Sequence, residues 1–530
     1  MRWEILSKKS KNIIKTLLKN RGIKSEKEFF NPRYPGKIMA NSLGLSKTQI
    51  KKAIERIKQA KKNKEKVIVY GDYDADGICA TAIVWEALFA LGIDALPYIP
   101  ERFSEGYGLN ASSISKLKTQ DPKLKLIVTV DNGIVAYEGI KKAKELGIDV
   151  IIVDHHQPGN KKLNSYSVIH NSKVCGSALA YFFAKQLGKT DGLELAAIGT
   201  IADQMPLAGV NRSIVKYGLG ELNKTVRPGL LALFEISAIT KVGTYEINYM
   251  IAPRINAMGR ISHGFDSLRL LCTKDKIKAL GLARHLDEVN RERQRIVEKV
   301  VVHARGKVKD EKIIILSHES YHEGVIGLAA SRLVEEFYRP AIVLSRKKGI
   351  SKASARSISG FNIIEAIRQL EDLYLEGGGH PMAAGFSIET KKIGEFSKRM
   401  GKIAKGLLTE EILAKKLKID LELNFEEINP ELVERIRQFE PFGLGNPTPT
   451  FMSREVELLN ARTVGKDLSH LKLRLRLNAV VMDAIYFGGG GFYSKLTPGT
   501  KIDLAYQLEE NVWNNNKSLQ LKVKDLHLLD

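Results

Sequence analysis

Short apolar runs alternate with helix-like stretches between about residues 46 and 215. A basic stretch over about 46–64 predicts a helix, and the apolar runs 67–70 (VIVY), 126–130 (LIVTV) and 149–153 (DVIIV) follow it. Such runs, without polar alternation, are typical of strands that are buried on both faces of a parallel sheet. The rhythm therefore predicts an α/β domain in which helices cover a parallel sheet.

A long charged segment separates this part from a second unit of the same kind. Residues 274–305 have apolar positions at helical spacing and no proline, which predicts a connecting helix. Strands are predicted at 312–316 and 340–345 around a helix at 325–337, and the unit ends in the glycine-rich stretch 376–388 (EGGGHPMAAGFSI). We therefore expect two α/β domains joined by one long helix.

The last part of the chain changes to short strands in which hydrophobic and polar residues alternate. These strands are 455–461, 471–477, 479–487, 501–510 and 519–529. Five such strands predict a small Greek-key barrel of the OB type. The expected parts are an N-terminal extension (1–45), a first α/β domain (46–215), a connecting helical region (216–305), a second α/β domain (306–405) and the barrel (410–530).

The net charge says more about the function than the overall composition does. Hydrophobic residues make up 44% of the 530 residues and charged residues 27%, as in an ordinary soluble globular protein. The formal net charge of +23 is not ordinary, and it indicates a polyanionic partner, with nucleic acid ahead of a membrane surface. A lysine-rich solvated surface is the alternative that charge alone leaves open.

Cysteine usage and the N-terminal segment indicate the compartment. The three cysteines form no CxxC pair, which argues against a disulfide framework or a zinc site and fits a reducing cytoplasm. The first residues lack the apolar core of a signal peptide, and no apolar run is long enough to cross a bilayer. We expect a cytoplasmic protein with no membrane partner.

Three carboxylates follow the first buried strand at every second position, in the stretch GDYDADG (71–77). Asp72, Asp74 and Asp76 at one strand end would repel one another and raise each other's pKa unless a positive group lay among them. A hard divalent cation is the natural partner, because it takes oxygen ligands. An acidic turn that caps the following helix is the alternative for this motif alone.

Other apolar runs end in similar residues. Asp131 follows the second strand, Asp154, His155 and His156 follow the third, and a helix-like stretch delivers Asp203. Because parallel strands share one carboxyl edge, we expect these side chains to converge with the first three. Several carboxylates with one or two imidazoles suit Mn²⁺ or Mg²⁺, and so many anionic ligands predict two ions that act together on a phosphoester. A buried core pair is the alternative for the two histidines.

Together these motifs resemble the DHH phosphoesterase superfamily. GDYDADG (71–77), VDNG (130–133), DHH (154–156) and GTIAD (199–203) match its four motifs, and GGGHPMAAGF (377–386) resembles the hallmark of its companion DHHA1 domain. Within the superfamily, the chain is most similar to the RecJ family of single-strand-specific 5′→3′ exonucleases. Four further stretches carry that similarity: PERFSEGYGLN (100–110), APRINAMGRI (252–261), YHEGVIGLAASRL (321–333) and SARSISGFNI (354–363).

The resemblance implies a role for each matching residue. The implied metal ligands are Asp72, Asp74, Asp76, Asp131, His155 and Asp203, with Asp72 acting directly or through a neighbouring ligand. His156 would contact the scissile phosphate, and Asp154 would orient the imidazoles. The implied phosphate-contacting set is Arg102, Arg254, Arg260, Ser354, Arg356 and His380. A surface or interdomain ion pair is the alternative for any single arginine, and Asn256 is a structural candidate instead.

The resemblance also implies an activity. We expect a metal-dependent exodeoxyribonuclease of DNA repair and recombination, which acts from the 5′ end of single-stranded DNA in a DHH domain, a DHHA1 domain and an OB-type barrel. Expected partners are single-stranded DNA, with a helicase and a single-strand-binding protein as candidates, and the expected state is a monomer. Two alternatives stay open: a DHH phosphodiesterase for oligoribonucleotides or cyclic dinucleotides, and a non-catalytic DHH scaffold of a replication complex.

Overall fold

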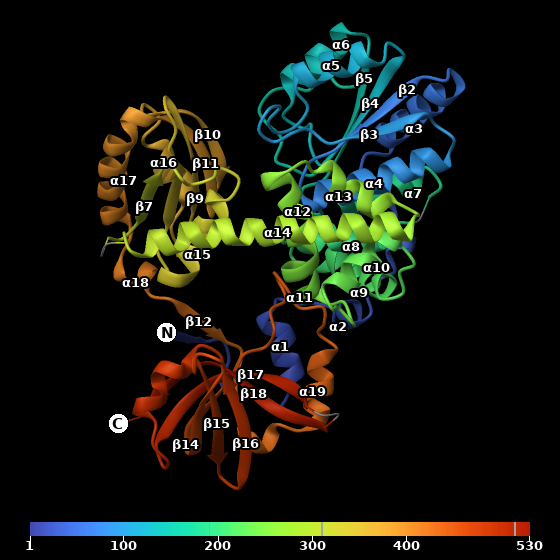
Figure 1. Cartoon of the computed structure of the whole chain (residues 1–530). Helices are drawn as coiled ribbons and strands as arrows, with labels where there is room; N and C mark the ends of the chain where they lie inside the picture. Colours follow the sequence, from blue (N-terminus) through green and yellow to red (C-terminus); the bar gives the residue numbers. More distant parts are fainter. Residues whose placement is uncertain (190, 309–310, 514–515, 530) are drawn as a thin grey trace. The chain divides into compact units, whose positions relative to one another are not determined.

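The structure is a computed structural model that describes residues 1–189, 191–308, 311–513 and 516–529. The chain divides into two compact units. Figure 1 colours the whole chain by sequence, from blue at the N-terminus to red at the C-terminus. One unit comprises Met1–Lys37, Gln204–Lys216 and Lys416–Asp530, and the other comprises Ile38–Asp203 and Tyr217–Lys415. We call them the barrel unit and the catalytic unit.

A five-stranded parallel sheet forms the first part of the catalytic unit. Its order is β3 (Ala95–Tyr98), β2 (Lys66–Tyr70), β4 (Leu124–Val130), β5 (Asp149–Asp154) and β6 (Ser167–His170). The apolar runs of β2, β4 and β5 are almost entirely buried, as the sequence predicts. The surrounding helices are α3 (Lys47–Lys62), α4 (Ala75–Ala90), α5 (Ala111–Gln120), α6 (Tyr137–Glu145) and α7 (Gly176–Gln186). In Figure 1, α5 and α6 lie together on one side of this sheet and α4 and α7 on the other.

A helical region follows the parallel sheet. Its helices are α8 (Leu193–Ala202), α9 (Gly209–Leu222), α10 (Pro228–Ile236), α11 (Thr244–Glu246), the π-helical η3 (Ile247–Ile251), α12 (Ala252–Ile261), α13 (Phe265–Cys272) and α14 (Lys276–Arg305). The 30-residue helix α14 packs against α10, α12 and α13 and also against α15 of the next sheet (Figure 1). It is the connecting helix that the sequence predicts.

The second sheet is mixed rather than parallel. Its order is β10 (Tyr374–His380), β11 (Ala383–Glu389), β9 (Ile350–Arg356), β8 (Ala341–Ser345) and β7 (Ile314–His318), and only β7 and β8 pair in parallel. The glycine-rich stretch forms the hairpin β10–β11 at its edge. Its helices are α15 (Ile326–Phe337), α16 (Ile363–Arg368), α17 (Ile393–Leu407) and α18 (Glu410–Leu413). The α/β class predicted for this part is confirmed.

The barrel unit contains a closed five-stranded barrel. Its strands are β14 (Phe451–Val464), β15 (His470–Leu477), β16 (Val480–Tyr486), β18 (Asn516–Leu528) and β17 (Lys501–Trp513), and β14 pairs with β17 to close it. The short strand β13 (Leu421–Glu422) pairs in parallel with the start of β14. Helix α19 (Pro430–Arg437) precedes the barrel, and strand β12 (Lys416–Ile419) pairs with the N-terminal strand β1 (Arg2–Ile5). The predicted OB-type barrel is confirmed.

The N-terminal segment packs on the barrel. Leu17 of α1 (Ile13–Asn20) and Phe29 of α2 (Glu26–Phe30) are buried in the same hydrophobic core as the barrel strands. Arg212 is 1% exposed and donates to five backbone carbonyls, those of Phe29, Gln438, Phe439, Glu440 and Pro441. These bonds satisfy a buried guanidinium without a carboxylate, and they tie three separate segments of the unit together.

Candidate active site

The GDYDADG stretch forms the turn between β2 and α4. Asp74 is the N-cap of α4, and its carboxylate accepts from the backbone N–H of Gly77 at 2.9 Å. Asp72 accepts from the N–H of Tyr73 at 2.7 Å. Asp76 accepts from two N–H groups at the start of α7, those of Gly176 at 2.6 Å and Ser177 at 3.0 Å. Backbone donors from two helix N-termini thus hold the three carboxylates.

Asp131 lies at the end of β4 in a left-handed conformation, with φ of 61°. Its Oδ1 atom is 3.1 Å from Nε2 of His155, yet this buried oxygen has no hydrogen-bond partner of acceptable geometry among the described residues. The same Nε2 lies 3.8 Å from Oδ2 of Asp203, the C-cap of α8. A carboxylate and an imidazole nitrogen that lie so close together without forming a hydrogen bond are typical of two ligands that share one metal ion.

Asp154 and His156 form a separate pair at the end of β5. Asp154 Oδ1 lies 2.7 Å from Nδ1 of His156, while Oδ2 accepts from the N–H of Ile134 at 2.8 Å. Burial lowers the pKa of His156, but the hydrogen bond and charge of Asp154 outweigh it and raise that pKa to about 8. The ring is also held at Nε2, 3.1 Å from the hydroxyl of Tyr107. Both nitrogens of His156 therefore have a partner.

These side chains converge as the strand pattern predicts. Three groups of potential ligand atoms each lie within 4.8 Å of one another: Asp72, Asp74 and Asp131; Asp76, His155 and Asp203; and Asp131, His155 and His156. Burial and then neighbouring carboxylates raise the pKa values of Asp72, Asp74 and Asp131, and they raise that of Asp203 to about 8. A bound cation would stabilise the ionised carboxylates and so lower these pKa values. Oxygen donors with an imidazole fit Mn²⁺ or Mg²⁺.

Two glycines to which the sequence analysis assigned no role shape this cluster. A Cβ atom at Gly176 would lie 2.4 Å from Oδ1 of Asp131, and one at Gly199 would lie 2.2 Å from Oδ1 of Asp76. Any side chain at either position would displace a carboxylate. The requirement arises from close backbone approach between α7, α8 and the sheet, so no local sequence pattern could have revealed it.

A cluster of arginines lies near the carboxylates. Burial, followed by the charges of Arg102, Arg293 and Arg356, lowers the pKa of Arg260 to about 10, although the charge of Asp74 acts in the other direction. Arg102 lies over the ring of Tyr73, 5.1 Å from its centroid, and Arg356 donates to Ser354 Oγ at 3.2 Å. A bound anion would stabilise this partly buried group of like charges, which together with Ser354 contains four of the six predicted phosphate contacts.

The structure also brings one arginine from outside the predicted phosphate set to this group, while two members of the set have other surroundings. Arg293 of α14, which the sequence analysis did not single out, has a buried Nε atom without a hydrogen-bond partner among the described residues. Arg254 is instead paired with Asp287, at 2.8 Å. His380 is exposed on the hairpin strand β10. Asn256 accepts from the N–H of Ala75 at 2.7 Å, which fits the structural role considered for it.

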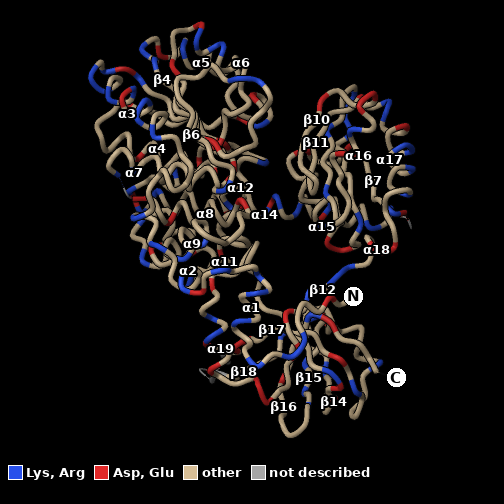
Figure 2. The backbone as a smooth tube through the Cα atoms, turned by 180° about the vertical axis from the view of Figure 1, so that it is seen from behind, with Lys and Arg blue, Asp and Glu red and all other residues tan. Residues whose placement is uncertain are grey.

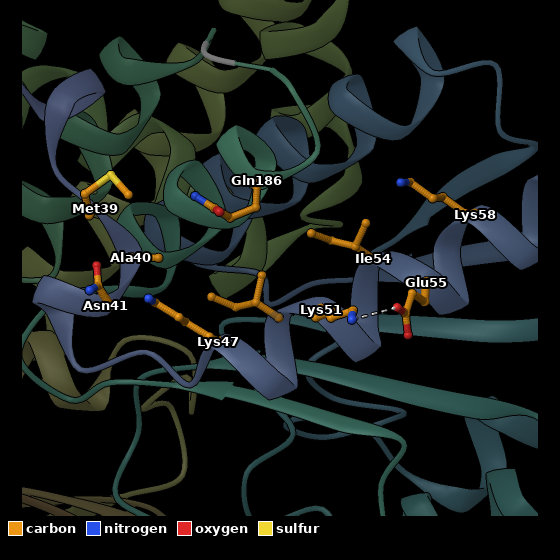
Figure 3. Close-up of a pocket in the computed structure, with 10 residues that line it drawn as sticks. Met39, Ala40, Asn41, Lys47, Lys51, Ile54, Glu55, Lys58 and Gln186 are labelled. Carbon is orange, nitrogen blue, oxygen red and sulfur yellow. Dashed lines mark ion pairs between the residues drawn. The ribbon is translucent and has the colours of Figure 1, made fainter.

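A cavity elsewhere in the catalytic unit shares none of these residues. It has a volume of about 390 Å³ and is lined by α3, by residues 39–41 and by Gln186 at the end of α7 (Figure 3). Ile50 and Ile54 line it beside lysines, and Lys51 forms an ion pair with Glu55 at 3.8 Å. Lys and Arg positions also occur on outer helices such as α3 and α17 (Figure 2), so the net charge by itself does not single out one face.

Comparisons with known proteins follow the same division of the chain. Family models match the DHH family N-terminal domain at residues 66–204, the DHHA1 domain at 310–406 and the RecJ OB domain at 419–525. The fold and the carboxylate-histidine cluster thus define a DHH phosphoesterase domain with its DHHA1 companion. Over the described residues, no helix is both long and apolar enough to cross a membrane.

Relatives that align over most of the chain define its family more narrowly. The chain is 31% identical to the single-stranded-DNA-specific exonuclease RecJ of Salmonella typhimurium, covering 97% of this chain and 95% of that one. It is 38% identical to the RecJ of Bacillus subtilis over 90% of this chain, but spans only 63% of that longer protein. The crystal structure of RecJ in complex with Mn²⁺ from Thermus thermophilus superposes with a TM-score of 0.85 at 29% identity, covering 100% of this chain and 80% of that one. The chain belongs to the RecJ family.

Proposed function

We propose that the chain hydrolyses single-stranded DNA from its 5′ end and releases mononucleotides. The observation that carries the proposal is the meeting of two groups in one unit: a cluster of five aspartates with His155, and the partly buried arginines around Arg260. The RecJ proteins of S. typhimurium and B. subtilis, named for this substrate, support it. Hydrolysis of a phosphodiester at a strand end requires metal ligands beside a site that binds an anion, and this unit has both kinds of group.

Six residues would hold the metal ions. They are Asp72, Asp74, Asp76, Asp131, His155 and Asp203. When bound, divalent ions such as Mn²⁺ or Mg²⁺ supply Lewis acidity that activates water and neutralises charge developing on phosphate oxygens. The Mn²⁺ complex of the T. thermophilus relative supports this choice.

The remaining residues of the site bind and orient. Asp154 and Tyr107 hold the two nitrogens of His156, so that the ring lies fixed beside the ligand cluster, where it would contact the scissile phosphate. Arg102, Arg260 and Arg356 would bind the 5′-terminal phosphate, because planar guanidinium groups grip phosphate oxygens with paired hydrogen bonds. Ser354, 3.2 Å from Arg356, would add a hydroxyl donor.

The barrel would add affinity for the strand. OB-type barrels bind single strands through basic and aromatic side chains without sequence preference. We infer in addition that the chain works as a cytoplasmic monomer on strands that a helicase opens or a single-strand-binding protein presents. Its three free cysteines, without a disulfide, are compatible with a reducing compartment.

End-labelled substrates test the proposal directly. With Mn²⁺, a single strand labelled at its 5′ end should lose its label as a mononucleotide at once, whereas a 3′-labelled strand should shorten progressively. A blunt duplex should be degraded far more slowly. Release of the 3′ label first, or turnover of cyclic dinucleotides with the single strand left intact, would overturn the assignment.

A further inference from the structure

Two tyrosines of the catalytic unit present their rings to solvent as a pair. Tyr245 is 63% exposed and Tyr249 is 67% exposed. They lie one helical turn apart on α11 and η3, and their ring centroids are 4.8 Å apart with the planes tilted by 36°. Neighbouring aromatic rings that stay exposed on a helix are more typical of a binding surface than of a folding contact.

Positively charged side chains follow the pair on the same helical run and on the neighbouring helix α14. Arg254 donates to the carbonyl of Met250, the residue after Tyr249, at 2.6 Å. It also pairs with Asp287 at 2.8 Å, and the same carboxylate pairs with Arg291 at 2.7 Å. One carboxylate is thus shared by two guanidinium groups, which leaves a net positive charge, and the side chain of Arg291 is 65% exposed. Exposed aromatic rings on one helical run and an exposed arginine on the helix α14 that packs against that run suit a nucleic acid strand, which offers bases and phosphates in alternation.

The tyrosine pair lies on the element that reaches the candidate active site. α11, η3 and α12 form one continuous helical run from Thr244 to Ile261. Asn256 of this run accepts from the N–H of Ala75 in the carboxylate-bearing turn, at 2.7 Å. At a rise of about 1.5 Å per residue, Tyr249 lies about 10 Å from Asn256 along the helix axis. The π-helical turn at Ile247–Ile251 is of a kind often found at functional sites.

We propose that Tyr245 and Tyr249 form a stacking platform for nucleobases of the single-stranded substrate, with Arg291 contacting a phosphate of the same strand. This inference rests on the proposed function, to which it adds a base-binding subsite a few nucleotides from the metal ligands. Because every base has an aromatic face, such a platform binds all four bases and leaves the enzyme indifferent to sequence.

Binding by paired variants gives the first test. Anisotropy of a fluorescent oligonucleotide is measured in EDTA, so that the strand stays intact. The double variant Tyr245→Ala/Tyr249→Ala should bind about fivefold to 100-fold more weakly than wild type, while Tyr245→Phe/Tyr249→Phe, which keeps both rings, should bind within about twofold of it. Phe89→Ala is the matched control: Phe89 is 66% exposed and pairs with Trp85 on α4, so its removal should leave binding unchanged.

Abasic strands separate stacking from other effects. A set of oligonucleotides with one abasic residue moved along the strand should reveal one or two positions at which wild type loses affinity. The alanine double variant should be insensitive at those positions and normal elsewhere. An unchanged abasic profile in this variant, or equal losses from alanine and phenylalanine, would overturn the platform while leaving the proposed function intact. A wild-type protein that binds no single strand would overturn both.

Discussion

Oδ1 of Asp154 lies 2.7 Å from Nδ1 of His156, and the other oxygen of the same carboxylate accepts the N–H of Ile134. The carboxylate is held on both sides, so it orients the imidazole instead of reaching the substrate. Asp154→Asn keeps the shape of the side chain but leaves only one acceptor oxygen for two partners, the His156 ring and the N–H of Ile134. Turnover of a single strand at saturating Mn²⁺ should fall by about 10- to 100-fold, with strand binding little changed.

Asp149→Asn is the control for this substitution. Asp149 begins the same strand, but it pairs with Arg56 at 2.6 Å, at the opposite end of β5 from the ligand cluster. Its amide variant should hydrolyse DNA at a near wild-type rate. Equal slowing of the two variants would show that Asp154 acts through the stability of β5 alone.

A single methyl group should weaken metal binding. A Cβ at Gly199 would lie 2.2 Å from Asp76 Oδ1 and 2.1 Å from Ser177 Oγ, so Gly199→Ala must displace the carboxylate. We expect Mn²⁺ affinity, measured by isothermal titration calorimetry, to fall by at least about tenfold. Gly281→Ala is the matched variant: this glycine of α14 faces open space, and its substitution should leave affinity unchanged and stabilise the helix by about 1 kcal/mol. Wild-type affinity in Gly199→Ala would contradict the geometry.

The partly buried arginines should distinguish one end of the strand from the other. Arg356→Ala removes a charged donor to the terminal phosphate, a loss of about 1.5–3 kcal/mol. Digestion of 5′-phosphorylated strands should slow by about 10- to 100-fold, and that of 5′-hydroxyl strands far less. Arg399→Ala, which breaks an exposed pair with Asp372, should affect neither. If Arg356→Ala slows both substrates by the same factor, the arginine is a general backbone contact.

The excess of basic residues should appear as salt dependence. If a basic path follows the phosphate backbone, binding of the inactive variant Asp131→Ala to single strands should weaken steeply as salt increases. Each neutralised phosphate contributes about −0.7 to the slope of log affinity against log salt concentration. A slope near zero would mean that the +23 charge is a solvated surface with no bound polyanion.

The sequence predicted that the candidate ligands converge, because one topological rule governs their positions. Asp72, Asp131 and His155 follow three strands of one parallel sheet, and such strands end at the same edge. The fold class followed from the same periodicity. The backbone donors at Gly176 and Ser177 were not predictable, since they depend on how α7 packs against the sheet.

The arginines show more clearly which features of the site the sequence could not predict. Arg254 belongs to the same sequence motif as Arg260, yet it pairs with Asp287 because α12 packs along α14. Arg293 joins the partly buried arginine cluster from the middle of a helix whose charged residues otherwise indicate a solvated face. Which arginine pairs and which stays available depends on contacts between helices, and no local pattern contains that information. The roles of the phosphate-contacting set stay predictions.

The central claim is that the aspartate-histidine cluster is a divalent metal centre that performs hydrolysis. The most direct measurement is the rate of mononucleotide release from a single strand across a Mn²⁺ titration, for wild type and for His155→Ala and Asp131→Ala. We predict saturable, EDTA-sensitive hydrolysis by wild type, and a loss of more than about 100-fold in each variant at every Mn²⁺ concentration. Near wild-type rates in either folded variant, or wild-type hydrolysis that persists in EDTA, would contradict the account.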